Sequence, residues 1–346
     1  AYGLKVPYRS YGLNGETPIV DEKGQSLSVA RQAMRRGLSV ALINSGTSTE
    51  PGTGCFLASV TARSNHDDIM AQLVESGADI LMGGGEGWTL PVGVQGHYGP
   101  GLRKDGRNLI EEARKAGYTV VFNRDELLAL PSSTNKVFGV FAHNQTFNDV
   151  TEETLAEKNL PAYWPYAPTI GEMTQVALRI LEAKNRPFFA MIEEEGTDNF
   201  ANNNNARDTL LALKRADDAI GLAREYISKH PHTLIMVTAD SNAGAMHMLS
   251  VKVDKDGNPP AKVDKADRNG AAYDGINGTE TAPFIAQPDR AGVRLPFVVV
   301  WGTLNDAAGG VLVRAEGLNA ELVQGSFDNT KVAELIRLTL FGTTKP

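Results

Sequence analysis

Two apolar runs that end abruptly in carboxylates constrain the fold of this chain more than any other feature. The first run begins at Phe189 and ends at Glu193, and the second begins at Thr233 and ends at Asp240. Runs of this kind are typical of buried strands, so each strand delivers its carboxylate to its carboxyl end. In open α/β sheets, ligands bind beyond that end of the strands. The two runs therefore predict a ligand site in the loops that follow two strands.

Further apolar runs alternate with helical patterns along the chain. Expected helices cover residues 26–36, 67–75, 108–115, 172–183, 207–228 and 330–339, and expected strands cover residues 38–43, 79–82, 118–122, 137–141, 189–192, 235–238 and 297–301. Alternation of strands and helices is typical of parallel strands joined by crossover helices. We therefore expect an α/β fold, a three-layer sandwich with a mostly parallel central sheet.

The alternation stops between about residues 246 and 295. This segment is rich in Asp, Lys, Gly, Pro and Asn, and it contains no long apolar run. A chain of 346 residues is long enough for one large α/β domain. We therefore expect a single domain over residues 1–346, with residues 246–295 forming a loop-rich insertion over the edge of the sheet.

Charge and composition exclude several classes of protein. The net charge of −7 leaves no basic face for phosphate backbones, which argues against nucleic acid as a specific partner. No apolar run reaches the length of a membrane span. The lone Cys55 rules out a disulfide within the chain and a cysteine-rich zinc site. The chain begins at Ala1 without an initiator methionine, so the lack of a secretory signal in it excludes nothing.

Oxygen-bearing side chains recur after the first carboxylate-terminated run. Asp198 follows Glu193 by five residues, and Asn202 follows Asp198 by four. Carboxylate and amide oxygens are the ligands that hard divalent cations prefer. A polar loop with a helix-capping residue would also explain this segment alone. Convergence with Asp240 favours a metal site, and we expect at least one of the two residues that follow Glu193, Glu194 and Glu195, to face solvent.

Taken together, these motifs resemble the alkaline phosphatase family. The spacing of Glu193, Asp198 and Asn202 is that of a Glu, an Asp and a His in the family, and residues 238–241 resemble its Thr-Ala-Asp-His phrase. Other matching passages are Val60-Thr-Ala-Arg63, the helix–strand–triple-glycine passage at residues 73–85, and the last helix at residues 328–336. The resemblance extends from about Gly3 to Gly342.

The resemblance assigns roles to individual residues. It implies that Arg63 binds the substrate phosphate, and that Glu193, Asp198 and Asp240 are metal ligands together with Glu50, Asn202, Ser241 and Asp306. Three of these positions, Asn202, Ser241 and Asp306, replace histidines of the family. Imidazole favours zinc, whereas carboxylates, amides and hydroxyls favour magnesium or calcium. We therefore expect divalent metal cofactors, with calcium or magnesium favoured over zinc in at least one site.

The same resemblance implies hydrolysis of small phosphate monoesters through a phosphoenzyme, in a periplasmic or secreted protein that forms a homodimer. The nucleophilic serine of the family, and its first metal-binding aspartate, lie upstream of the phrase that Gly3-Leu-Lys5 resembles. We therefore expect an N-terminally incomplete domain whose nucleophile lies upstream of Ala1. Two alternatives remain: a phosphodiester or sulfate-ester hydrolase of the same superfamily, and a non-catalytic relative that binds phosphate or metal.

Overall fold

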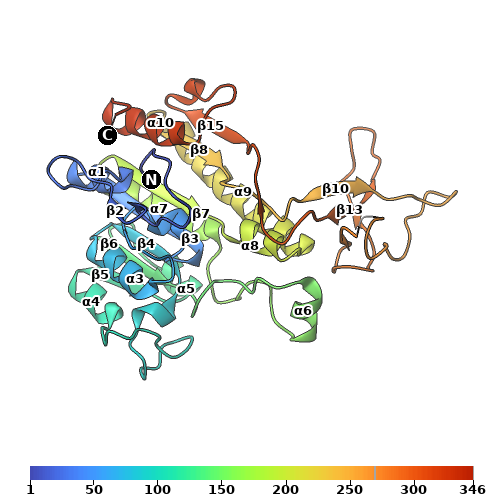
Figure 1. Cartoon of the computed structure of the whole chain (residues 1–346), viewed down its shortest axis with the longest axis horizontal. Coiled ribbons are helices and arrows are strands. Elements are labelled where there is room, and N and C mark those ends of the chain that lie inside the picture. The colour runs from blue at the N-terminus through green and yellow to red at the C-terminus, as the bar shows by residue number, and fades with distance from the viewer. Residues whose placement is uncertain (269, 346) are drawn as a thin grey trace.

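The structure is a computed structural model that describes residues 1–268 and 270–345 (Figure 1). Its centre is a sheet of five parallel strands in the order β5-β6-β4-β3-β7. These strands are β3 (Ser39–Thr47), β4 (Ile80–Gly84), β5 (Tyr118–Val121), β6 (Lys136–Val140) and β7 (Phe188–Glu193). The expected parallel central sheet is therefore confirmed.

Helices cover both faces of this sheet. Core residues of one face come from α1 (Val29–Arg35), α3 (His66–Glu75), α4 (Leu109–Lys115) and α10 (Thr330–Phe341). Core residues of the other face come from α5 (Arg124–Leu128), α7 (Ile170–Ala183) and α9 (Ala206–Lys229). Alternate residues of β3 enter the two cores, with Val40 and Leu42 in the first, and Ala41 and Ile43 in the second. Burial on both faces explains the continuous apolar runs and confirms the three-layer α/β fold.

Side-chain caps mark where α7, which precedes β7, and α9, which follows α8 (Gly196–Asn202), begin. Thr169 accepts a hydrogen bond from the backbone of Glu172, and the Glu172 side chain accepts one from the backbone of Thr169. This capping box starts α7 at Ile170, three residues after the buried core residue Ala167. At the start of α9, the Asn205 side chain accepts from the backbone of Asp208. The six expected helices begin and end within about three residues of their expected bounds, whereas α2 (Pro51–Gly54), α5, α6 (Glu152–Glu157) and α8 were not expected.

Two expected strands lie outside the parallel sheet. Strand β8 (Leu234–Thr238) pairs antiparallel with β15 (Val313–Gly317). Strand β13 (Pro296–Val300) pairs antiparallel with β10 (His247–Ser250), β11 (Tyr273–Asp274) and β12 (Phe284–Ile285). A strand pattern predicts an extended segment but not its partner, and here the partners are short strands with weak patterns of their own.

The expected insertion at residues 246–295 supplies β10, β11 and β12. Figure 1 shows their small sheet projecting past α8 (Gly196–Asn202), to the side of the five-stranded sheet. The assignment of the whole chain to one domain remains a prediction. No helix in the described ranges is both long and apolar enough to cross a bilayer. Shorter elements are β1 (Leu13–Asn14), β2 (Thr17–Pro18), α2 (Pro51–Gly54), η1 (Glu86–Thr89), α6 (Glu152–Glu157), β9 (Asn242–Ala243), β14 (Asp306–Ala307) and η2 (Ala320–Leu322).

Candidate metal and phosphate site

The ends of the neighbouring strands β3 and β7 form one side of the candidate site. Asn44 lies opposite Glu193 in the parallel pairing, and its Nδ2 donates to Glu193 Oε2 over 2.6 Å. Asn44 is fully buried. The sequence interpretation missed Asn44, although it directly follows the apolar run 38–43, the same signal that identified Glu193.

Helix α2 closes over the Glu193 carboxylate. A Cβ atom on Gly52 would lie 1.8 Å from Glu193 Oε1, which is far inside van der Waals contact. Only glycine therefore allows the backbone of α2 to approach this carboxylate so closely. Glu50 directly precedes α2, and its charge also acts on the Glu193 carboxylate.

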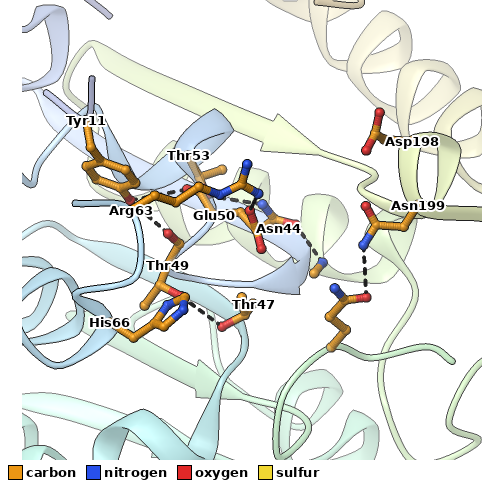
Figure 2. Close-up of polar contacts among 12 residues, drawn as sticks. Tyr11, Asn44, Thr47, Thr49, Glu50, Thr53, Arg63, His66, Asp198 and Asn199 are labelled. Carbon is orange, nitrogen blue, oxygen red and sulfur yellow. Dashed lines mark hydrogen bonds and ion pairs between the residues drawn. The ribbon is translucent and has the colours of Figure 1, made fainter. Parts of the chain in front are cut away.

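Arg63 forms an ion pair with Glu50 (Figure 2). The Arg63 side chain is 57% exposed, whereas that of Glu50 is only 12% exposed. The loop behind this pair is held by Tyr11, whose hydroxyl donates to the Thr49 carbonyl over 2.9 Å. The Thr49 hydroxyl in turn lies 2.8 Å from His66 Nδ1. Arg63 is therefore held at Glu50 while more than half of its side chain remains exposed.

Asn202 at the end of α8 joins three segments of the second side of the site. Its Nδ2 donates to both carboxylate oxygens of Asp198 over 3.3 Å and to Asp306 Oδ1 over 2.8 Å. Its Oδ1 accepts from the backbone N–H of Gly244 over 3.0 Å. Strand β14 carries Asp306 and pairs with β9. Because β9 contacts α8, this pairing brings Asp306 close to α8. Ser241 lies near Asp306 and helps to lower the pKa of that carboxylate, after the larger effect of Asn202.

The carboxylates of the site repel one another. Burial, with repulsion from Asp306, raises the pKa of Asp198 to about 7. The hydrogen bond from Asn202 lowers the pKa of Asp306. Burial first, and then the charge of Asp240, raises the pKa of Glu193. Asp240 is itself exposed at the end of β8. This concentration of negative charge favours a bound cation.

Glu194 and Glu195 are both buried, at 9% exposure each. Glu194 accepts hydrogen bonds from the hydroxyls of Ser45 and Tyr163, each over 2.8 Å. Burial, followed by repulsion from Glu193, raises the pKa of Glu195 well above its ordinary value. The expectation that at least one of them faces solvent is therefore wrong, because the chain turns directly from β7 into α8 and holds both against the core.

The donor atoms fit a hard divalent cation. Glu193, Asp198, Asp240 and Asp306 offer carboxylate oxygens, and Asn202 and Ser241 lie among them. Within residues 1–268 and 270–345, no three His, Cys, Asp or Glu side chains already lie close enough together to hold an ion. The side-chain amide of Asn202 lies between Asp198 and Asp306 and donates hydrogen bonds to both.

Comparison with known proteins agrees with this fold. The model of the alkaline phosphatase family matches residues 12–341. The membrane-bound alkaline phosphatase of Bombyx mori is 30% identical over 273 residues, which cover 69% of this chain and 47% of that protein. The chain spans about half the length of the curated relatives it matches.

Solved structures show the same fold. The alkaline phosphatase of the Antarctic bacterium TAB5 superposes with a TM-score of 0.71 at 18% identity, covering 98% of this chain and 81% of that one. A His-to-Asp mutant of that enzyme, described with Mg bound in its M3 site, gives a TM-score of 0.68 at 19% identity over the same shares. Because the family match covers nearly the whole chain, this protein belongs to the alkaline phosphatase family.

Proposed function

We propose that this chain forms the metal- and phosphate-binding part of a hydrolase that cleaves small-molecule phosphate monoesters. The observation that carries this proposal is the convergence of Asp198, Asn202 and Asp306 from distant segments. Arg63 and Glu193 border the same cluster. A cation-binding cluster beside an accessible arginine is the arrangement that phosphoryl transfer requires, because that reaction depends on positioning and neutralisation of charge.

Arg63 would bind the transferred group. Its planar guanidinium matches two non-bridging phosphate oxygens at once. Glu50 holds the guanidinium in place until the anion arrives. Since the Arg63 side chain is more than half exposed, an entering phosphate can compete for it without disturbing the core.

The divalent ions would be held by Glu193, Asp198 and Asp240, with Asn202, Ser241, Asp306 and Glu50 completing the sites. Bound ions supply neutralisation of the charge that develops on the leaving oxygen. The Mg bound by the TAB5 mutant supports a divalent cofactor in this family. Because oxygen donors make up this set, we propose calcium or magnesium in preference to zinc at one position or more.

We further propose that the nucleophile is carried by another segment, which pairs with β7 and β8 and completes a phosphoenzyme mechanism. In the described ranges, β7 pairs with β3 alone and β8 pairs with β15 alone, so each strand has one free edge. Helix α9 packs on β8 and on α7, which covers β7. Most apolar residues of both strands are only half-buried, as expected where a neighbouring strand is absent.

A comparison of two proteins tests this assignment. The whole natural protein should hydrolyse p-nitrophenyl phosphate, and a protein of residues 1–346 alone should bind divalent ions without enzymatic turnover, because it lacks the attacking oxygen. An intact mass well above 37.2 kDa for the natural protein would agree. Robust metal-dependent turnover by residues 1–346 alone would instead locate the nucleophile inside this sequence.

Family membership also motivates two further parts of the proposal. We infer a homodimer and a location in the periplasm or outside the cell. The acidic net charge of −7 supports small phosphate esters, rather than nucleic acid, as partners. Size-exclusion chromatography with light scattering tests the dimer, and fractionation of the source cells tests the location.

A further inference from the structure

A cavity of about 300 Å³ opens beside the candidate site. We call it the aromatic pocket. Its walls come from the segment after β6, from the segment before α7 and from the loop after η1. The residues that line it are Tyr98, His143, Asn144, Gln145, Phe147, Asn148, Asp149, Trp164 and Tyr166.

Three rings in this wall are arranged face to face. Tyr98 stacks on Tyr166 with centroids 4.7 Å apart and an interplanar angle of 15°. Tyr166 is nearly parallel to Trp164, at 5.8 Å and 9°. All three rings are only half-buried. The backbone N–H of Trp164 donates to the Thr146 carbonyl over 2.9 Å, which anchors the main chain that carries this ring. The pocket therefore presents partly exposed aromatic surface.

Two residues of the pocket connect it to the candidate site. Gln145 Oε1 accepts from Asn199 Nδ2 over 3.1 Å, and Asp149 Oδ2 accepts from the same atom over 3.4 Å. Asn199 directly follows Asp198 on α8, and Figure 2 shows both side chains on the side of the helix that faces Glu50 and Asn44. The aromatic pocket therefore adjoins the site in which Asp198 lies, within reach of the alcohol part of a bound ester.

We propose that the aromatic pocket binds the leaving group of the ester, and that this group is a nucleoside. The inference rests on the proposed phosphatase function. Trp164 offers a half-buried ring on which a base can stack, and Asn144 and Asn148 offer amides that can hydrogen-bond to its edge. The lining contains an aspartate but neither lysine nor arginine, which disfavours additional phosphates. The substrate class is therefore a nucleoside monophosphate.

Enzyme kinetics test the pocket in the whole natural protein. Trp164→Ala should lower kcat/KM for adenosine monophosphate by about five- to 150-fold, the range for loss of one base-stacking contact. It should leave kcat/KM for glycerol phosphate, which has no ring, within about twofold. Trp164→Phe should retain most of the nucleotide preference. Tyr8→Ala removes an exposed ring outside the pocket and should leave kcat/KM for both substrates unchanged.

A binding measurement separates this inference from the proposed function. Adenosine should bind the wild-type protein in isothermal titration calorimetry, ribose should bind far more weakly, and Trp164→Ala should abolish the difference. A protein that binds adenosine in this way but hydrolyses no monoester would refute the proposed function and support the pocket. Hydrolysis of both esters at equal kcat/KM, with no adenosine binding, would overturn the pocket and leave the phosphatase intact. Equal losses for both substrates in Trp164→Ala would also overturn it.

Discussion

The Asn202 amide donates to Asp306 over 2.8 Å, although 104 residues separate the two in the chain. The same amide bonds to Asp198 one helical turn earlier. This relationship joins α8, which follows the last strand of the parallel sheet, to β14, which comes after the insertion. It places a neutral amide between two carboxylates.

We predict that Asn202→His shifts the metal preference of the protein toward zinc. An imidazole nitrogen suits zinc, whereas the amide oxygen of asparagine suits magnesium or calcium. Elemental analysis of protein purified without added metal measures the result. The wild type should contain magnesium or calcium in at least one position, and the variant should contain more zinc. Stoichiometric zinc at two sites of the wild type, with neither lighter ion present, would refute the preference.

Arg63→Ala should weaken inhibition by inorganic phosphate and lower turnover about ten- to a hundredfold. Loss of a charge-assisted bidentate contact costs about 1.5–3 kcal/mol, which gives that range. Arg63→Lys should retain only part of the phosphate inhibition and turnover of the wild type, because an ammonium cannot make the planar double contact. Arg290→Ala, on the exposed surface of the insertion, is the control. Unchanged phosphate inhibition in Arg63→Ala would exclude the assigned role.

Gly52→Ala should displace the Glu193 carboxylate and weaken the binding of divalent ions. The new methyl group would lie 1.8 Å from Glu193 Oε1, and such overpacking costs about 1–3 kcal/mol of stability. The matched control is Gly221→Ala in the middle of α9, where no atom lies within 4 Å of the added Cβ. That control should stabilise the protein by about 0.5–1 kcal/mol. Equal magnesium affinities of the two variants in calorimetry would count against the predicted contact.

Metal-free protein should lose stability with rising pH because of Asp198. Burial and Asp306 raise its pKa from 3.8 to about 7 in the folded state. Between these values the folded state keeps a proton that the unfolded state releases, so the free energy of unfolding falls as pH rises. Below about pH 4 both states are protonated, and this contribution is fully present.

Thermal unfolding in EDTA between pH 4 and pH 8 measures this effect. Asp198→Asn should show a smaller decline in Tm than the wild type, since the variant has no proton to lose at this position. Added magnesium should reduce the decline in the wild type, because the ion stabilises the ionised carboxylate. Identical pH profiles for wild type and variant would show that Asp198 does not carry the raised pKa.

The parallel core could be predicted because its central strands β3 and β4 are buried along their whole length. In β3, Val40 and Ala41 enter opposite cores, so the whole run is apolar and easy to recognise. The partners of β8 and β13 could not be predicted. Strand β8 pairs with Val313–Gly317, whose sequence, Val-Arg-Ala-Glu-Gly, has little apolar character. Pairing between such distant segments depends on the packing of the complete fold.

The candidate site was predictable where residues keep a regular spacing after a strand, as with Glu193 and Asp198. Asn44 was missed because a single amide after an apolar run has many explanations. The contact between Thr49 and His66 was missed because nothing in the sequence relates the two positions. The burial of Glu194 could not be predicted either, since its partner Tyr163 comes from a separate loop.

The most direct test of the proposed function is chelation of the whole natural protein during hydrolysis of p-nitrophenyl phosphate. We predict that exhaustive treatment with EDTA abolishes turnover, that added divalent ions restore it, and that Asp198→Asn is restored poorly at the same ion concentration. Turnover that persists unchanged after all metal has been removed, as verified by elemental analysis, would contradict the account.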